Sequence, residues 1–188
     1  MTKALWKPGT MLYPVPAVMV SCGDRPENYN IITVAWAGTV CSEPPMVSIS
    51  VRPSRHSHSI IERTEEFVIN LVTKKLTFAV DYCGVKSGKE INKFKQLKLT
   101  PLKGEHVSAP LIKESPVNIE CRVTERKALG SHDMFLAKVL CIHADQQYID
   151  KKGAFDLAAA QLICYSHGKY YLLGKELGHF GFSVRKKK

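Results

Sequence analysis

A dense group of cations and hydroxyls follows a short apolar segment in residues 46–61, MVSISVRPSRHSHSII. Alternating residue types predict a strand over 46–51, and the break at Pro53 ends it. The apolar pair Ile60 and Ile61 then indicates a helix. Free amides at a helix start, hydroxyls and guanidinium groups all donate to phosphate oxygens. The segment therefore predicts an anion site, and the alternative is a solvated basic turn. Its polar residues are Arg52, Ser54, Arg55, His56, Ser57, His58 and Ser59.

The composition is that of a globular chain with a strong positive charge. The 188 residues are 45% hydrophobic and 23% charged, with a net charge of +10. This length predicts one domain over residues 1–188, with a disordered basic tail at 185–188. Lysines spread along the whole chain, and such a surface can attract nucleic acid or small anions such as nucleotides. Because no zinc-finger, RNA-binding or helix-turn-helix pattern is visible, nucleic acid is not an expected partner.

The six cysteines form no Cys-x-x-Cys pair, so a structural zinc site is not expected. Most lie in apolar, strand-like runs, where they are expected to be buried, reduced thiols. The sequence shows neither a signal peptide nor an apolar run long enough to span a bilayer. We therefore expect a cytoplasmic protein with no membrane partner. The cysteines are Cys22, Cys41, Cys83, Cys121, Cys141 and Cys164.

Predicted strands dominate the chain, and the predicted helices are few and short. Residues 118–126 alternate apolar and charged side chains, which is typical of a sheet with one wet face. A hairpin is expected around His167 and Gly168. Many antiparallel strands with few helices favour a closed or nearly closed barrel. The expected strands are 17–22, 31–40, 46–51, 67–72, 118–126, 134–144, 161–166 and 169–173; the expected helices are 57–63, 76–83 and 90–95.

Several motifs occur in an order that resembles a known family. They are Asn30 ahead of a strand, then SEPP, SVRPSRHSHSII, FVINL, CGVKSGKEINKF, APLIKESPVNIECRV, LGSHDMFLAKV and YYLLGKELGHFGFSV. Over residues 9–184 the chain resembles the flavin reductase-like family with an FMN-binding split barrel, and most closely the flavoredoxin branch. The resemblance implies a mainly β fold, a six-stranded antiparallel barrel with a few short peripheral helices. It also implies a homodimer with one FMN per subunit near the dimer interface.

The resemblance also implies which residues contact FMN. Lys93 stands four residues after Lys89, so a helix over 90–95 would point both toward one phosphate. The alternative for either lysine is a solvated surface group. The residues implied at the phosphate are Arg52, Arg55, Ser57, Ser87, Lys89 and Lys93.

The flavin ring needs a flat apolar surface and hydrogen bonds along its edge. The resemblance places Asn30, Ile32, Thr33 and Trp36 there, although Asn30 could be a turn residue and Trp36 a core residue. Ile32 is bulkier than expected and could narrow the substrate side. His132 would contact the flavin or a nicotinamide donor, and its alternative is a loop residue. Tyr165 would reach the flavin from the barrel or from the other subunit.

Three functions remain open from the sequence. The first is an FMN-dependent enzyme that oxidises NADH or NADPH, which would stack transiently because no dinucleotide-binding glycine motif is present. The second is an electron carrier that holds FMN tightly and exchanges electrons with a redox protein. The third is a non-catalytic basic binding protein. In the first two cases the flavin N5 accepts the hydride, so no catalytic side chain is required, and no nucleophile elbow or phosphate loop is present.

Overall fold

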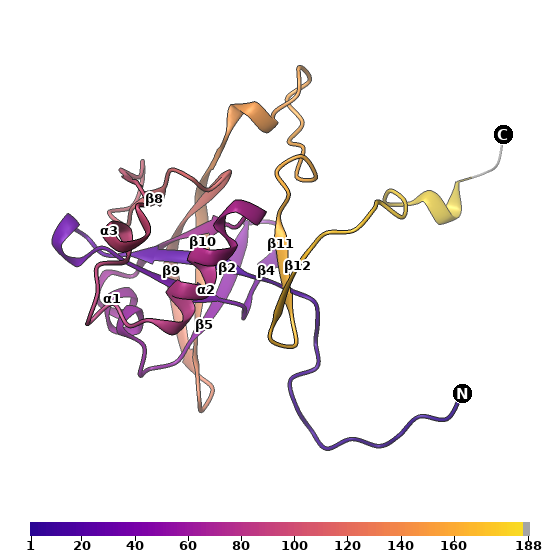
Figure 1. Ribbon diagram of the computed structural model, residues 1–188, viewed down its shortest axis with the longest axis horizontal. Coiled ribbons are helices and arrows are strands. Elements are labelled where there is room, and N and C mark those ends of the chain that lie inside the picture. The colour runs from indigo at the N-terminus through magenta and orange to yellow at the C-terminus, as the bar shows by residue number, and fades with distance from the viewer. Residues whose placement is uncertain (186–188) are drawn as a thin grey trace.

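The fold is a seven-stranded antiparallel sheet that bends back on itself (Figure 1). The computed structural model describes residues 1–185; the expected basic tail lies outside the described residues except for Arg185, which is exposed. In spatial order the strands are β3 (Asn30–Val34), β2 (Val18–Cys22), β6 (Glu66–Leu71), β9 (Val117–Ala128), β10 (Asp133–Ala144), β5 (Met46–Val51) and β4 (Ala37–Cys41).

One bent segment closes this sheet. Strands β3 and β4 lie at opposite edges of the sheet, yet only Ala35 and Trp36 separate them in the chain. At the bend the Ser50 amide donates to the Trp36 carbonyl at 2.8 Å, which attaches the corner to β5. The sequence predicted a single strand over 31–40. Counted as one bent strand, β3 and β4 make the predicted six-stranded antiparallel barrel, and this prediction is confirmed.

Short helices and small sheets surround the barrel. Helices α2 (Thr77–Val85) and α3 (Lys93–Leu97) pack against β3, and α1 (His56–Thr64) follows β5. Strand β1 (Val15–Pro16) pairs with the hairpin β11 (Ile163–Ser166) and β12 (Lys169–Leu172), and β7 (Pro101–Leu102) pairs with β8 (Leu111–Ile112). Four 3₁₀ turns complete the described part: Pro26–Asn28, Lys74–Leu76, Gln146–Tyr148 and Phe182–Val184. None of the described helices is long and apolar enough to cross a membrane.

The helix predicted over 90–95 begins later than expected. Residues 88–90 form a turn, and α3 starts at Lys93 because the Asn92 side chain caps it, accepting from the Lys95 amide at 3.0 Å. Lys89 and Lys93 therefore do not share a helix face, and that part of the prediction is wrong.

Two apolar clusters lie on either side of β2 and β3. The barrel interior is filled by alternate strand residues, such as Val20, Ile49 and Phe135, and by Ile60 and Ile61 of α1. The second cluster lies between the sheet and α2, α3 and β11. Strand β3 contributes Ile32 to the first cluster and Ile31 to the second. Because both faces of β3 are packed, the strand cannot rotate about its own axis. This burial fixes the edge along which the candidate site is built.

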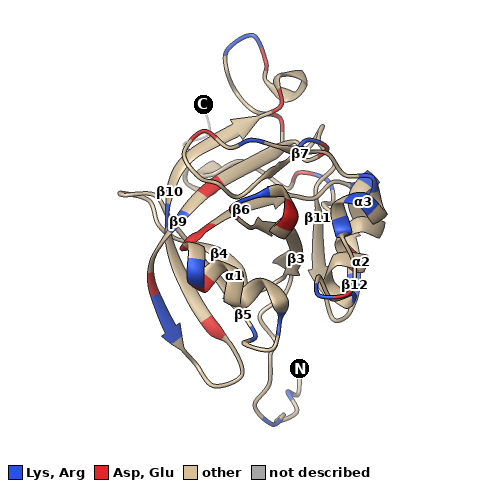
Figure 2. Cartoon of the chain, turned by 90° about the vertical axis from the view of Figure 1, so that its left-hand side faces the viewer, with Lys and Arg blue, Asp and Glu red and all other residues tan. Residues whose placement is uncertain are grey.

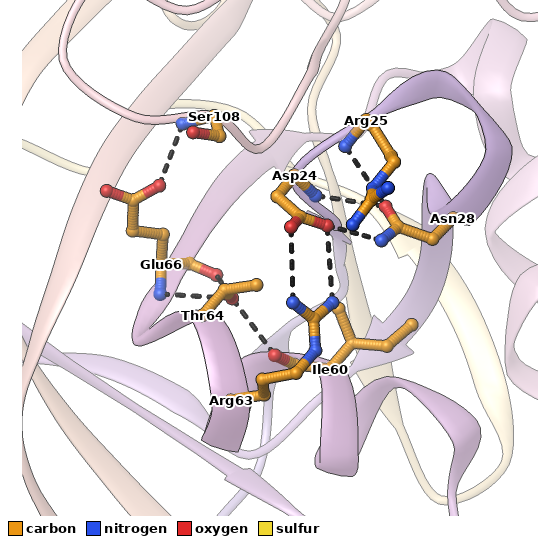
Figure 3. Close-up of polar contacts among 8 residues, drawn as sticks. All are labelled: Asp24, Arg25, Asn28, Ile60, Arg63, Thr64, Glu66 and Ser108. Atoms are coloured by element: carbon orange, nitrogen blue, oxygen red, sulfur yellow. Dashed lines mark hydrogen bonds and ion pairs between the residues drawn. The ribbon is translucent and has the colours of Figure 1, made fainter.

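A polar cluster joins the end of α1 to the turn before β3 (Figure 3). The Arg63 guanidinium donates to both carboxylate oxygens of Asp24, at 3.1 and 3.2 Å. Hydrogen bonds from Arg63 and Asn28 lower the pKa of the Asp24 carboxyl. The Thr64 hydroxyl donates to the Ile60 carbonyl at 3.0 Å in the last helical turn. These contacts orient α1, whose first turn faces the candidate site.

A buried carboxylate organises the loop that crosses β9. Glu120 is fully buried and accepts from the amides of Glu105, His106 and Val107 at 2.7 to 3.0 Å. Burial alone would raise the pKa of the Glu120 carboxyl. Hydrogen bonds from the amides of Glu105 and His106 and from the side chains of His143 and Cys141 outweigh it and lower the pKa to about 2. The loop is therefore tied to the strand by an ionised side chain.

Glu120→Gln should lower the free energy of unfolding by roughly 1.5–3 kcal/mol, because an amide group cannot accept from all these donors. The ionised carboxylate stabilises the folded protein above its ordinary pKa of 4.5, and this stabilisation is lost as the pH falls toward about 2. Denaturant unfolding between about pH 6 and pH 2.5 should therefore show a shallower loss of stability in the variant. Glu125→Gln, at an exposed position of β9, is the matched control. Equal pH dependence in both variants would contradict this account.

Candidate functional site

A polar cavity lies where β3, the turn after β5 and the start of α1 meet. Its volume is about 250 Å³. Arg52, Ser54 and Lys86 line it, and they supply two cations and a hydroxyl. Seven of the predicted site residues line the same cavity: Asn30, Ile32, Arg52, Arg55, Ser57, Ser87 and Lys93.

The start of α1 faces this cavity. Arg55 stands at the N-cap and makes no side-chain capping hydrogen bond, so the helix start lacks the usual Ser, Thr or Asp acceptor. Helix starts with free amides attract anions through the helix dipole. The guanidinium groups of Arg52 and Arg55 are exposed beside it. This arrangement suits a terminal phosphate.

Asn30 joins β3 to α1 inside the cavity. Its side chain is buried, and its Nδ2 donates to the Ser57 Oγ at 2.8 Å. Gly88 lies directly over this amide, since a Cβ on Gly88 would come within 2.2 Å of the Asn30 Oδ1. The loop that carries Ser87 can therefore approach β3 closely only with glycine at position 88.

Lys93 lines the cavity but is not a surface residue. It is 3% exposed, and its ammonium donates to the carbonyls of Ile31 at 2.6 Å and of Cys83 at 2.9 Å. Burial lowers the pKa of Lys93. An ammonium has three donors, so two join α3 to β3 and α2, and one is left for a group in the cavity. The alternative of a solvated Lys93 is wrong, because the side chain is enclosed.

Lys89 lines none of the cavities described here and is exposed, with its amide donating to the Ser87 Oγ at 3.2 Å. Its charge nevertheless reaches the site: burial lowers the pKa of His56, and the charges of Lys89 and Lys93 lower it further. His56 lines the cavity and is half-buried. An anion placed there would therefore meet a strongly positive potential.

A second cavity continues from the first along β3. Its volume is about 140 Å³, and it shares Ile32, Arg52 and Arg55 with the first. Residues 32–36 form one wall, and His132 also lines this cavity. Burial and the charge of Arg52 lower the pKa of His132. The predicted edge residues Ile32, Thr33 and Trp36 and the predicted His132 are thus brought together here.

Tyr165 belongs to a third, aromatic cavity of about 350 Å³. It shares Thr33 and Trp36 with the second cavity. The rings of Tyr13 and Trp36 are 6.1 Å apart, and those of Tyr13 and Tyr165 are 6.2 Å apart. The three cavities therefore follow β3 from a cationic end to an aromatic end.

The sequence places His58 among the polar residues of the predicted anion site, but the structure gives this side chain a different role. His58 lines none of the three cavities; it is buried, and its Nε2 lies 2.9 Å from the Asp133 Oδ2. Asp133 also accepts from Arg126 at 3.1 Å and directly follows His132. The pair therefore links the first turn of α1 to the start of β10, directly after the loop that carries His132. Cys83, Lys86 and Gly88 were also missed, although Gly88 lies within the Ser-Gly-Lys turn and Lys86 directly precedes it, so the turn was a usable signal.

Comparisons with known proteins agree with this arrangement. The sequence profile of the flavin reductase like domain matches residues 10–172. An uncharacterized protein of Archaeoglobus fulgidus is 31% identical over 141 residues, which cover 75% of this chain and 78% of that protein.

Two solved structures share the fold over almost the whole chain. Flavoredoxin of Desulfovibrio vulgaris (Miyazaki F) has a TM-score of 0.90 and 29% identity, covering 98% of this chain and 100% of that one. Flavoredoxin from Methanosarcina acetivorans has a TM-score of 0.88 and 23% identity with the same coverage. The chain therefore belongs to the flavin reductase like domain family, and the flavoredoxin structures to which it is similar agree with the predicted resemblance to that branch.

Proposed function

We propose that this protein is an oxidoreductase that binds FMN in the groove along β3. The observation that carries the proposal is the continuity of a cationic cavity with a second cavity walled by residues 32–36. FMN has one terminal phosphate, a polar ribityl chain and a flat ring. Arg52, Arg55 and the start of α1 suit the phosphate, and the β3 edge with Trp36 suits the ring. The family name and the name flavoredoxin both designate flavin chemistry, which supports this choice.

The protein's own residues would bind and orient the cofactor. Bound FMN would supply hydride acceptance at its N5. Arg52 and Arg55 would neutralise the phosphate, and Asn30 would hold β3 and α1 at a fixed separation through Ser57. His132, with its lowered pKa, would be neutral near pH 7 and able to accept a hydrogen bond.

We propose NADH or NADPH as the electron donor, entering from the aromatic end of the groove. A transient donor needs an open face, and the cavity lined by Tyr13, Trp36 and Tyr165 lies beside the proposed ring position. A carrier that takes electrons from a redox protein is the second candidate, and the flavoredoxin likeness favours it. A basic binding protein without redox chemistry is the third. Anaerobic mixing of FMN-loaded protein with NADH or NADPH separates them: flavin bleaching supports the enzyme, and its absence despite FMN binding supports the carrier.

Arg52→Ala and Arg55→Ala should each weaken FMN binding by about tenfold to hundredfold, because each removes a charge-assisted contact worth roughly 1.5–3 kcal/mol. Riboflavin lacks the phosphate, so its affinity should hardly change. Quenching of flavin fluorescence measures both dissociation constants, with Lys95→Ala on the exposed face of α3 as control. Equal losses of affinity for FMN and riboflavin would contradict the assignment of these arginines to the phosphate.

Lys93→Met should lower the free energy of unfolding by about 1–3 kcal/mol, because the carbonyls of Ile31 and Cys83 lose a buried donor. It should also weaken FMN and riboflavin together, since β3 itself is displaced. Thermal melting and flavin titration of the same variant measure both effects. A loss confined to FMN, with unchanged stability, would instead place Lys93 at the phosphate.

We further propose that the protein is a homodimer. Both terminal segments extend away from the barrel on the side of β11 and β12 (Figure 1). They expose large apolar side chains, among them Trp6 at 74%, Leu177 at 96% and Phe180 at 107%. A second copy that buries these side chains would remove this exposed apolar surface.

Phe180→Ser combined with Phe182→Ser should convert the dimer to a monomer at about 10 μM, because apolar interface anchors contribute most of the binding energy. Sedimentation velocity measures the mass, and the control is Ile142→Ser on β10, where the side chain is about as exposed as Phe182. A wild-type monomer at this concentration would refute the dimer. A double variant that remains dimeric would show that the interface does not depend on Phe180 and Phe182.

A further inference from the structure

A second group of chemically active side chains lies on the outer side of β9 and β10, away from the groove. Glu120, Cys141 and His143 each offer one ligand atom, and all three atoms lie within 4.8 Å of one another. The His143 Nε2 is 2.6 Å from a Glu120 carboxylate oxygen and 3.4 Å from the Cys141 Sγ. The three side chains therefore converge on one point.

A β-bulge creates this convergence. The pairing of β9 with β10 shifts between Val139 and Cys141, so that Cys141 stands opposite Glu120 and His143 lies two residues further on the same face. Bulges redirect side chains in this way. No spacing within either strand signals the group, which explains why the absence of Cys-x-x-Cys pairs predicted no metal site.

Hydrogen bonds from the backbone keep the Glu120 carboxylate ionised and fixed in orientation. Three backbone amides of the loop at 105–107 fix its orientation, and Gly104 allows the loop to approach, since a Cβ there would lie 3.2 Å from the Glu120 Cδ. Such outer hydrogen bonds orient ligands in metal sites. One position on the Glu120 Oε1 is occupied by His143, and a cation could take the place of the shared proton.

Local charge favours a cation here although the protein as a whole is basic. Lys and Arg occur in many elements of the chain (Figure 2), whereas the negative charges of Glu120 and Glu105 act on Cys141. Burial and these negative charges raise the pKa of the Cys141 thiol to about 11. A metal ion would reverse this effect by binding the thiolate directly.

We propose that Glu120, Cys141 and His143 form a binding site for a divalent transition-metal ion, with Zn²⁺ as the ion that suits this ligand set. Imidazole nitrogen, thiolate sulfur and carboxylate oxygen are all zinc ligands. As the Zn–S bond forms, the Cys141 S–H bond breaks and its proton passes to solvent. His143 binds through Nε2 as the neutral tautomer that carries its proton on Nδ1, and a water is the fourth ligand. The carboxylate and the thiolate then carry two negative charges, which the ion neutralises. Zinc bonds of about 2.0–2.3 Å require His143 to move slightly outward, and its side chain is 37% exposed and free to do so.

The site is distinct from the flavin groove. His143 lies ten positions after Asp133, the first residue of β10, and His132 directly precedes that strand; ten positions correspond to roughly 33 Å along an extended strand. The metal would join the loop at 104–107 to two strands at the far end of the barrel. Its role would therefore be structural, and the proposal does not depend on flavin binding.

The test uses untagged full-length protein, freed of metal by a chelator and kept reduced with a phosphine. Titration with Co²⁺ as a probe should produce a thiolate-to-metal charge-transfer band and strong visible bands of a four-coordinate ion, and Zn²⁺ should abolish both. Zn²⁺ alone should raise the melting temperature. Absence of a thiolate band at saturating Co²⁺ would overturn the proposal.

Matched variants assign the ligands. Cys141→Ser should remove the charge-transfer band, and His143→Gln should weaken binding by more than the roughly 10–100-fold that loss of an outer-shell partner costs. Both residues lie on a partly exposed strand face, so the fold should survive, which circular dichroism checks. Cys41→Ser, at a partly exposed thiol of β4, should leave the spectrum unchanged. Unchanged binding in both Cys141→Ser and His143→Gln would overturn the assignment.

Discussion

The buried ammonium of Lys93 is the constraint on which the groove depends. A charge placed in an apolar surrounding must find acceptors, and Lys93 finds them in the backbone of β3 and at the end of α2. This single side chain therefore fixes three elements relative to one another. Because Ile31 packs outward and Ile32 inward, the same strand is locked from both sides. The edge of β3 is thus a rigid surface, as a bound planar ring requires.

The bend at Ala35 and Trp36 gives this edge its place in the fold. The strand that opens the sheet as β3 closes it as β4, so the residues around the bend meet both ends of the sheet. The turn after β5 and the start of α1 then lie beside β3, and their cations face its polar end. The hydrogen bond from Asn30 to Ser57 fixes the distance between β3 and the start of α1. The bend that closes the barrel therefore determines both the proposed phosphate position and the proposed ring position.

The sequence predicted the features that depend on local pattern. Alternation located β5 and β9 within two residues, and the apolar runs at 67–72 and 134–144 located β6 and β10 within one residue. The group after Pro53 identified the cationic end of the groove. Features that depend on packing could not be read in this way. Nothing local marks the bend within residues 31–40, and lysine is normally an exposed residue, so the burial of Lys93 was unexpected. The start of α3 was misplaced because the cap at Asn92 was overlooked. The convergence of Glu120, Cys141 and His143 depends on a bulge across two strands, which no single segment reveals.

The most direct test of the central claim is a crystal structure of the protein grown with FMN. The account predicts that the phosphate lies within hydrogen-bond distance of Arg52 and Arg55, at the start of α1. It also predicts that the flavin ring lies along residues 32–36, with Asn30 still bonded to Ser57. A flavin bound outside this groove, or bound in it with the phosphate at the aromatic end near Tyr165, would contradict the account.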